Sequence, residues 1–402
     1  MRYHHISNTP AKQQIPLLLP YFAVFIMLIT TEGTSNQACL LWLTLWVFRL
    51  IYHFNKVYSG SIFILLSVLL TVVCLCFFST SKTLNFYIFF EFSIPPTLFI
   101  IILYGYQPEK LTASSYLVIY TVLSSLPMLL VLLTLPDYLF YVPPCASLHT
   151  IVALSFGFIV KTPIYLVHVW LPKAHVEAPV AGSIVLAGVL LKLGSYGLLV
   201  FLPLFIHSVL NFYLCLSVVG GVVCCHACAR QWDIKGLIAY SSVVHMGVVT
   251  VGFVTGSELG YCCGMAIVIA HGVCSPLLFG VAFYMYENSH TRVLRRNRGN
   301  ICSPTVALIL FCLLAVNIGV PPFINVWAEV LIFSTLFYII TWSVPFVLPL
   351  ALLAVLYNIV IFVMLTHGKE SAAITFTVRP WQYVRSLALS LLFSFNIRFI
   401  YI

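Results

Sequence analysis

Residues 303–338 read SPTVALILFCLLAVNIGVPPFINVWAEVLIFSTLFY, an apolar run of 36 residues that decides how the chain is threaded. As one straight helix this run would measure about 54 Å, well over the roughly 30 Å hydrocarbon core of a bilayer. Gly319, Pro321 and Pro322 lie near its middle, and proline removes a backbone donor and breaks a helix. The run is therefore either two membrane spans or one span that is interrupted at depth.

Similar apolar runs recur along the whole chain. Of the 402 residues 62% are hydrophobic and 7% are charged, and the mean hydropathy is +1.08. A soluble domain carries about a quarter of charged residues, so the sequence excludes that class. The first run ends at Glu32 without a small-residue cleavage site, so we expect it to remain in the protein. We predict an all-α polytopic membrane protein with about 13 transmembrane helices, at residues 15–31, 36–52, 59–78, 84–104, 113–134, 148–170, 180–201, 204–228, 235–256, 259–285, 303–338, 343–366 and 384–401.

The distribution of basic loop residues favours the interrupted span, because Lys and Arg collect on the cytoplasmic or matrix side of a membrane protein. With residues 303–338 as one span, fifteen of the 19 Lys and Arg residues fall on one side and two on the other. Two full spans would move Lys369, Arg379 and Arg385 to the wrong side. We therefore predict that the N-terminus and the Arg292–Arg298 loop face the matrix or cytoplasm, with the C-terminus opposite.

The spans also form a repeat. Two sets of five spans follow one another, and the fourth span of each set is interrupted, at Lys161-Thr162-Pro163 in the first and at Gly319–Pro322 in the second. An odd number of spans inverts the second set, and inverted repeats with broken helices are typical of ion-coupled transporters. The predicted domains are 1–58 (N-terminal transmembrane helices), 59–201 (first five-helix repeat), 204–366 (inverted second repeat) and 367–402 (C-terminal loop and last helix).

Four ionisable residues lie well inside predicted spans: Glu91, Lys161, Lys192 and Glu329. One charge at the bilayer centre costs roughly 2.5–3.5 kcal/mol, so such residues are rarely idle. Two acids and two lysines can neutralise one another and pass protons, and the alternative is a static ion pair that only fixes helix packing. Lys192 is surrounded in sequence by small and apolar residues that cannot satisfy an ammonium group. We therefore expect water or a partner from another span beside it.

His245 and His271 lie in the ninth and tenth spans. A neutral imidazole accepts a proton on one nitrogen and donates one from the other, as a proton wire requires. The alternative is a packed histidine bonded to a nearby hydroxyl, and Ser241, Ser242 and Ser275 are available.

The sequence predicts no metal and no cofactor in this chain. Cys224, Cys225 and Cys228 stand close to His226, but no second ligand pair follows at zinc-site spacing, so we interpret them as apolar packing residues. No glycine-rich phosphate loop and no flavin, haem or iron–sulfur pattern is present. We expect this chain to carry no electrons itself.

One segment has a specific family resemblance. Residues 161–197 read KTPIYLVHVWLPKAHVEAPVAGSIVLAGVLLKLGSYG, with a membrane lysine, then H-x-W-L-P-x-A-H-x-E-A-P-x-x-G-S, then a second lysine. This pattern resembles the signature of subunit 4 of mitochondrial NADH:ubiquinone oxidoreductase, respiratory complex I. Segments that begin at Glu91, Arg230, Ala270 and Pro321 agree with the same family, so the resemblance covers roughly residues 85–365.

The resemblance implies roles for the residues already singled out. The family's proton path would use Glu91 and Lys161 as a switchable pair, Lys192 as the central relay and Glu329 as the terminal residue, with His245 and His271 between them. It further implies one subunit of an NADH:ubiquinone reductase (H+-translocating), in which NADH, FMN, iron–sulfur clusters and ubiquinone belong to partner subunits.

The implied location is the mitochondrial inner membrane. The expected partners are other complex I subunits, above all neighbouring antiporter-like ones, and membrane lipids, with no nucleic acid. An Mrp-type cation/proton antiporter subunit is the alternative function. A structural scaffold would leave four costly intramembrane charges unexplained.

Overall fold

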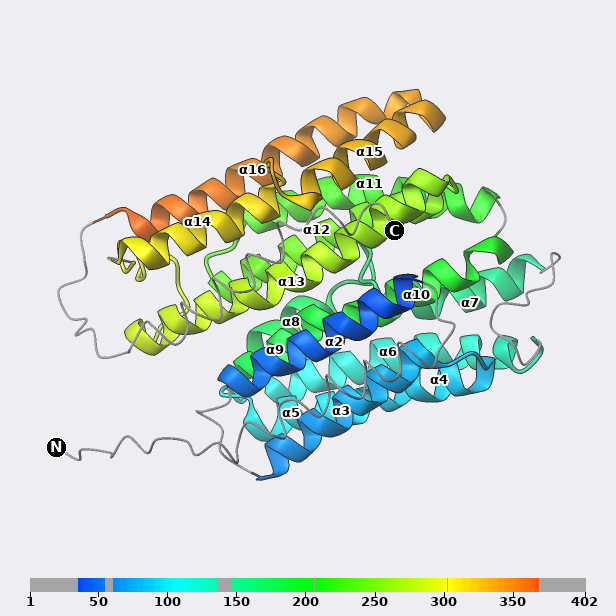
Figure 1. The fold of residues 1–402 in the computed structure, drawn as a ribbon, viewed down its shortest axis with the longest axis horizontal. Helices are drawn as coiled ribbons and strands as arrows, with labels where there is room; N and C mark the ends of the chain where they lie inside the picture. Colours follow the sequence, from blue (N-terminus) through cyan, green and yellow to red (C-terminus); the bar gives the residue numbers. More distant parts are fainter. Residues whose placement is uncertain (1–34, 55–60, 136–146, 206, 302, 369–402) are drawn as a thin grey trace.

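The computed structural model describes residues 35–54, 61–135, 147–205, 207–301 and 303–368. Within these ranges the chain is helical and the helices run roughly along the long axis of the molecule (Figure 1), which confirms the predicted all-α class. The predicted spans 15–31 and 384–401 lie outside the described residues, so the total of 13 spans stays a prediction. The helices are α2 (Ser35–Phe54), α3 (Ser61–Ser79), α4 (Thr83–Phe92), α5 (Ile94–Tyr104), α6 (Lys110–Leu132), α7 (Leu148–Lys161), α8 (Trp170–Glu177), α9 (Val180–Val185), the π-helix η3 (Leu186–Leu190), α10 (Leu191–Phe201), the 3-10 helix η4 (Leu202–Leu204), α11 (His207–Arg230), α12 (Ile234–Val254), α13 (Glu258–Ser289), α14 (Pro304–Ile318), α15 (Ile324–Ile339), the 3-10 helix η5 (Thr341–Ser343) and α16 (Val344–Thr366).

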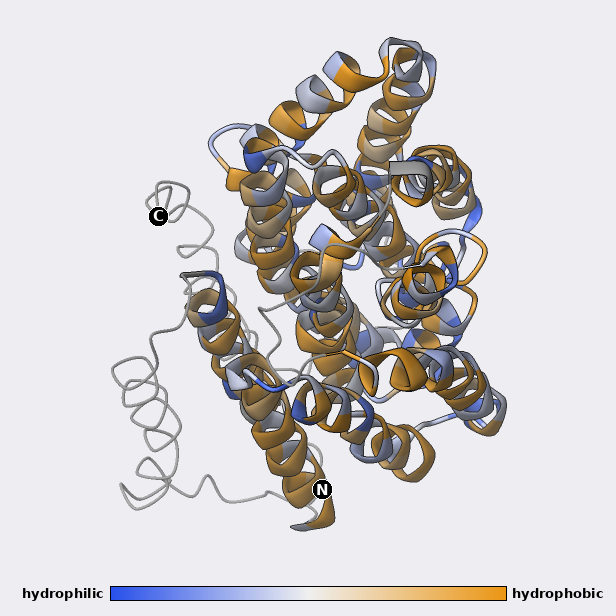
Figure 2. Ribbon diagram, turned by 90° about the vertical axis from the view of Figure 1, so that its right-hand side faces the viewer, coloured by the Kyte–Doolittle hydropathy of each residue, from blue (hydrophilic) through white to orange (hydrophobic). Residues whose placement is uncertain are grey.

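Eight helical segments of the described chain are long and apolar enough to cross a membrane, and α2, α7, α14 and α15 contribute shorter apolar helices. Apolar colour runs along most of the length of the helices (Figure 2). In three segments, 180–204, 234–254 and 258–289, 89% of the most apolar window is buried, against 33% to 50% in the other five. These three segments therefore form the interior of the bundle, away from lipid.

The first predicted interruption lies between α7 and α8. The α7 helix ends at Lys161, immediately before Thr162 and Pro163, and α8 begins at Trp170. The indole Nε1 of Trp170 donates to the carbonyl of Val160 at 3.0 Å, which satisfies one of the carbonyls freed at the end of α7. Helical structure continues in α8 to Glu177, past the predicted end of the span at residue 170.

The second predicted interruption separates α14 from α15. Gly319 adopts φ +76°, and the N–H groups of Gly319 and Val320 bond to the carbonyls of Val316 and Ala315, the pattern of a Schellman helix end. The amide Nδ2 of Asn325 donates to the same Val316 carbonyl at 2.7 Å. In both interrupted spans, therefore, a side chain from the following segment caps the helix that has ended.

Two further irregularities were not predicted. The span expected at 84–104 divides at Ser93 into α4 and α5, because Pro95 and Pro96 cannot continue the hydrogen-bond ladder. The span expected at 180–201 contains the π-helical turn η3, which ends two residues before Lys192. A π-turn widens a helix locally and is frequent at functional sites.

Candidate functional site

The ammonium group of Lys192 lies at the centre of the bundle. The residue is 0% exposed, and its Nζ donates to the carbonyl of Ala187 at 2.8 Å and lies 2.9 Å from Nδ1 of His271 on α13. The prediction that local sequence cannot satisfy this ammonium was wrong, because the Ala187 carbonyl in η3 accepts one of its hydrogen bonds. The expected partner from another span is present in His271.

Lys192 also fixes the tautomer of His271. An ammonium group has donors only, so a charged Lys192 requires Nδ1 of His271 to act as the acceptor. Close approach is possible because Gly272 follows: a Cβ at this position would lie 3.3 Å from Cε of Lys192 and 2.6 Å from Leu43.

His245 of α12 lies between His271 and the second interrupted span. The imidazole centroids of His245 and His271 are 5.5 Å apart. Nδ1 of His245 lies 3.4 Å from Oε1 of Glu329 on α15. Lys192, His271, His245 and Glu329 thus form a sequence of neighbouring titratable groups on four different helices.

The hydroxyl groups that could have held these two imidazoles are engaged elsewhere. Ser241 and Ser242 donate to the carbonyls of Ile238 and Ala239 in their own helix. Ser275 donates to the backbone carbonyl of His271 at 2.7 Å rather than to its ring. The packed-histidine alternative therefore lacks its expected partners.

Lys161 and Glu91 are neighbours but do not form an ion pair. Nζ of Lys161 donates to the carbonyl of Phe90 at 2.6 Å and lies 3.3 Å from the centroid of the Phe90 ring. Within the described chain no salt bridge of 4.0 Å or less joins Lys161 to Glu91, although the two charges interact electrostatically. Oε1 of Glu91 is buried and has no hydrogen-bond partner there.

An apolar region separates Lys161 from Lys192. A Cβ on Gly194 would lie 2.8 Å from the backbone nitrogen of Thr162, so α10 packs directly against the break after α7. The ring of Phe158 packs edge-to-face against the rings of Phe86 and Phe90. Among the described residues no hydrogen bond or ion pair connects the two lysines.

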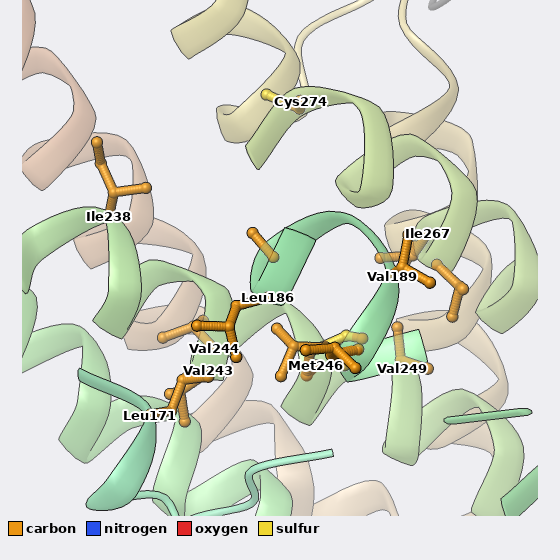
Figure 3. Close-up of a cluster of buried hydrophobic side chains, with 14 of the residues drawn as sticks. Leu171, Leu186, Val189, Ile238, Val243, Val244, Met246, Val249, Ile267 and Cys274 are labelled. Atoms are coloured by element: carbon orange, nitrogen blue, oxygen red, sulfur yellow. The ribbon is translucent and has the colours of Figure 1, made fainter. Parts of the chain in front are cut away.

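The side chains around the titratable groups from Lys192 to Glu329 are also apolar. Figure 3 shows side chains of α8, η3, α12 and α13 gathered around η3, and its labelled residues are Leu171, Leu186, Val189, Ile238, Val243, Val244, Met246, Val249, Ile267 and Cys274. Charges in such an interior are screened far less than charges in water, so each titratable neighbour has a strong effect on the next.

Sequence reasoning assigned no role to three other buried ionisable residues: His175, Glu177 and Lys235. They are 0%, 4% and 4% exposed, and Nζ of Lys235 donates to the carbonyl of Ala178 at 3.0 Å. Lys235 is the first residue of the predicted span 235–256. His175 and Glu177 stand in the A-H-x-E-A-P run, which was used only for the resemblance and which was the available signal.

Comparison with known proteins gives one matching protein family. The sequence model described as "NADH:quinone oxidoreductase/Mrp antiporter, TM" matches residues 80–356. NADH-ubiquinone oxidoreductase chain 4 of Locusta migratoria is 40% identical over 350 residues, 82% of this chain and 78% of that one. The chain 4 protein of Albinaria caerulea is 36% identical, over 90% of this chain and 87% of that one.

Solved structures show the same fold at low sequence identity. A chain of respiratory complex I from Thermus thermophilus superposes with a TM-score of 0.84 at 22% identity, covering 95% of this chain and 89% of that one. A chain of the Mrp complex from Dietzia gives a TM-score of 0.81 at 15% identity, covering 96% and 88%.

Proposed function

Because this chain belongs to the NADH:quinone oxidoreductase/Mrp antiporter transmembrane family and, within it, to NADH-ubiquinone oxidoreductase chain 4, we propose that it is a proton-translocating membrane-arm subunit of a respiratory NADH:ubiquinone oxidoreductase. NADH oxidation and quinone reduction take place in other subunits. NADH, FMN, iron–sulfur clusters and ubiquinone belong to those subunits, and this chain moves protons.

The observation that carries the proposal is the sequence of contacts from Lys192 through His271 and His245 to Glu329. At 2.9 Å the ammonium of Lys192 can hand a proton directly to Nδ1 of His271. The opposite nitrogen of that ring then releases a proton toward His245, through one water or by a ring rotation. His245 delivers it to the Glu329 carboxylate beside the second helix break.

Lys161 and Glu91 act as the switch of this path. Lys161 is held by the carbonyl and ring of Phe90, the residue immediately before Glu91. A small displacement of the ammonium group exchanges the Phe90 carbonyl for the Glu91 carboxylate. In one state of the switch Lys161 is paired with the Glu91 carboxylate. In the other state Lys161 is bonded to the Phe90 carbonyl.

The larger architecture is part of the same proposal. The chain has 13 spans with two inverted five-helix repeats at 59–201 and 204–366, between the terminal segments 1–58 and 367–402, and it lies in the mitochondrial inner membrane. The interrupted α7/α8 and α14/α15 spans support the repeats, and the uneven distribution of basic loop residues supports an N-terminus in the matrix and a C-terminus in the intermembrane space. Its partners are neighbouring antiporter-like subunits and lipids.

Mild-detergent purification tests the proposal. We expect the chain to co-migrate on a native gel with a large NADH-oxidising assembly that pumps protons after reconstitution. An isolated chain that exchanges sodium for protons in vesicles would instead support the Mrp-type antiporter, whose fold it shares.

A further inference from the structure

His175 is a buried imidazole that packing alone does not explain. It is 0% exposed, and neither ring nitrogen has a hydrogen-bond partner among the described residues. Its ring lies flat on Phe279 of α13, with centroids 4.7 Å apart and an interplanar angle of 8°. A phenylalanine would stack here without burying two unpaired polar atoms, which cost free energy.

Charged residues gather close to His175 at the end of α8. Nζ of Lys235 donates to the carbonyl of Ala178, and Nη1 of Arg292 donates to the carbonyl of Val176 at 2.8 Å. The carboxylate of Glu177 is acted on by both cations, and its Oε2 is buried without a hydrogen-bond partner in the described chain. Asp233 accepts from the backbone N–H of Lys235 at 3.1 Å and also acts on Glu177 electrostatically. We refer to Glu177, Asp233, Lys235 and Arg292 as the end cluster.

His175 is coupled electrostatically both to the end cluster and to Lys192. It precedes Glu177 by two residues, and both Lys235 and Lys192 act on it electrostatically. Phe279, on which it stacks, is two turns along α13 from His271. The backbone of His175 is held by Ser183, whose hydroxyl donates to the His175 carbonyl at 3.1 Å.

We propose that His175 relays protons between the end cluster and Lys192, an inference that rests on the proposed function. One ring nitrogen takes a proton from the Glu177 carboxyl group, directly or through water. The other nitrogen gives its own proton to the neutral amine of Lys192. An O–H bond breaks as an N–H bond forms on the ring, and a ring N–H bond breaks as the ammonium forms, so the imidazole stays neutral and one proton moves inward.

Three variants in the assembled complex separate a relay from a packing residue. His175→Phe keeps the aromatic stack but cannot carry a proton, and His175→Asn keeps polar atoms but cannot titrate. Phe279→Leu is the matched control, because it removes the stack and keeps the imidazole. Protons pumped per NADH oxidised would be measured in reconstituted vesicles, after a native gel has shown assembly.

If His175 is a relay, we expect the number of protons pumped per NADH oxidised to fall in both His175 variants to the value of Lys192→Ala. Phe279→Leu should keep the wild-type ratio. Wild-type pumping by His175→Phe would overturn the relay, and so would equal losses in Phe279→Leu and His175→Phe. If Lys192→Ala also pumped normally, the proposed function itself would fail. This outcome distinguishes a failure of the proposed function from a failure of the relay alone.

A measurement on the unaltered complex covers the case in which the His175 variants do not assemble. Water must reach the ring of a relay residue, and the imidazole Cε1 hydrogen then exchanges slowly with deuterium from heavy water, which mass spectrometry of peptides detects. We expect the Cε1 hydrogen of His175 to exchange with deuterium on the same timescale as the Cε1 hydrogen of the exposed His290. Full protection of His175 would rule the relay out.

Discussion

Nζ of Lys192 and Nδ1 of His271 lie 2.9 Å apart, although the two residues are 79 positions apart in the sequence. The contact joins the two halves of the described bundle, since Lys192 lies in the last span of the first predicted repeat and His271 lies within the second. The same Nζ also bonds to Ala187 in the π-turn η3. Lys192 is therefore positioned by both its own helix and the opposite half of the molecule.

Replacing Lys192 separates proton relay from charge pairing. Arginine keeps the positive charge but does not release its proton at physiological pH. We therefore expect Lys192→Arg to reduce proton pumping about as severely as Lys192→Ala, on the order of 10²-fold for the proton-transfer step. The measurement is proton translocation by the reconstituted complex. Full pumping with arginine would leave Lys192 as a structural charge.

Glu91 is expected to matter through its charge, because Lys161 already has the Phe90 carbonyl as a partner. Glu91→Ala should strongly impair coupled pumping, whereas Glu91→Asp should be partly tolerated. Lys161→Ala in the same assay is the reference for complete loss of the switch. Wild-type pumping by an assembled Glu91→Ala complex would remove the pair from the mechanism.

Gly319 links the second helix break to Glu329. A Cβ at this position would lie 3.2 Å from Oε2 of Glu329, and the backbone has φ +76°. Gly319→Ala should cost about 1–2 kcal/mol of stability through backbone strain and also lower pumping by displacing the carboxylate.

Gly256 provides the control for Gly319. It has a similar φ of +68°, and the nearest atom to a Cβ there is the Tyr261 hydroxyl at 4.0 Å. Gly256→Ala should therefore show the stability loss, read from thermal unfolding, with pumping intact. Equal pumping in both variants would show that Gly319 acts only through the backbone.

The basic loop Arg292–Arg298 is expected on the matrix side. In sealed mitoplasts, protease added from outside should leave this loop intact, and permeabilisation should make it cleavable. Cleavage in intact mitoplasts would contradict both the orientation and the number of spans.

The positions of the two helix breaks could be predicted from sequence because Pro163, Gly319 and Pro321 act locally, through missing N–H groups and backbone conformation. The π-turn η3 could not be predicted, because its sequence, LAGVL, is equally compatible with an α-helical turn. The same limit explains why Ala187 was missed as a partner of Lys192. Whether Lys161 contacts Glu91 or the adjacent Phe90 carbonyl depends on side-chain rotamers, which hydropathy and charge counts do not describe.

The residues of the candidate path were identifiable because charges inside an apolar run are rare and costly. Their order in space was not, because it depends on which helices meet in the interior. His175 was overlooked for a related reason: it lies two residues from both Lys173 and Glu177, in the segment between the predicted spans 148–170 and 180–201.

The end of α7 at Lys161 has a consequence for how that charge is stabilised. The aligned peptide dipoles of a helix leave roughly half a negative charge at its C-terminus, and Lys161 is the last residue of α7. Together with the Phe90 carbonyl and the electron-rich face of the Phe90 ring, this fixed partial charge compensates the ammonium without a full counter-ion. The Glu91 carboxylate then competes with dipoles rather than with another ion. In the proposed switch, protonating or deprotonating that one carboxylate would then decide where the Lys161 ammonium rests.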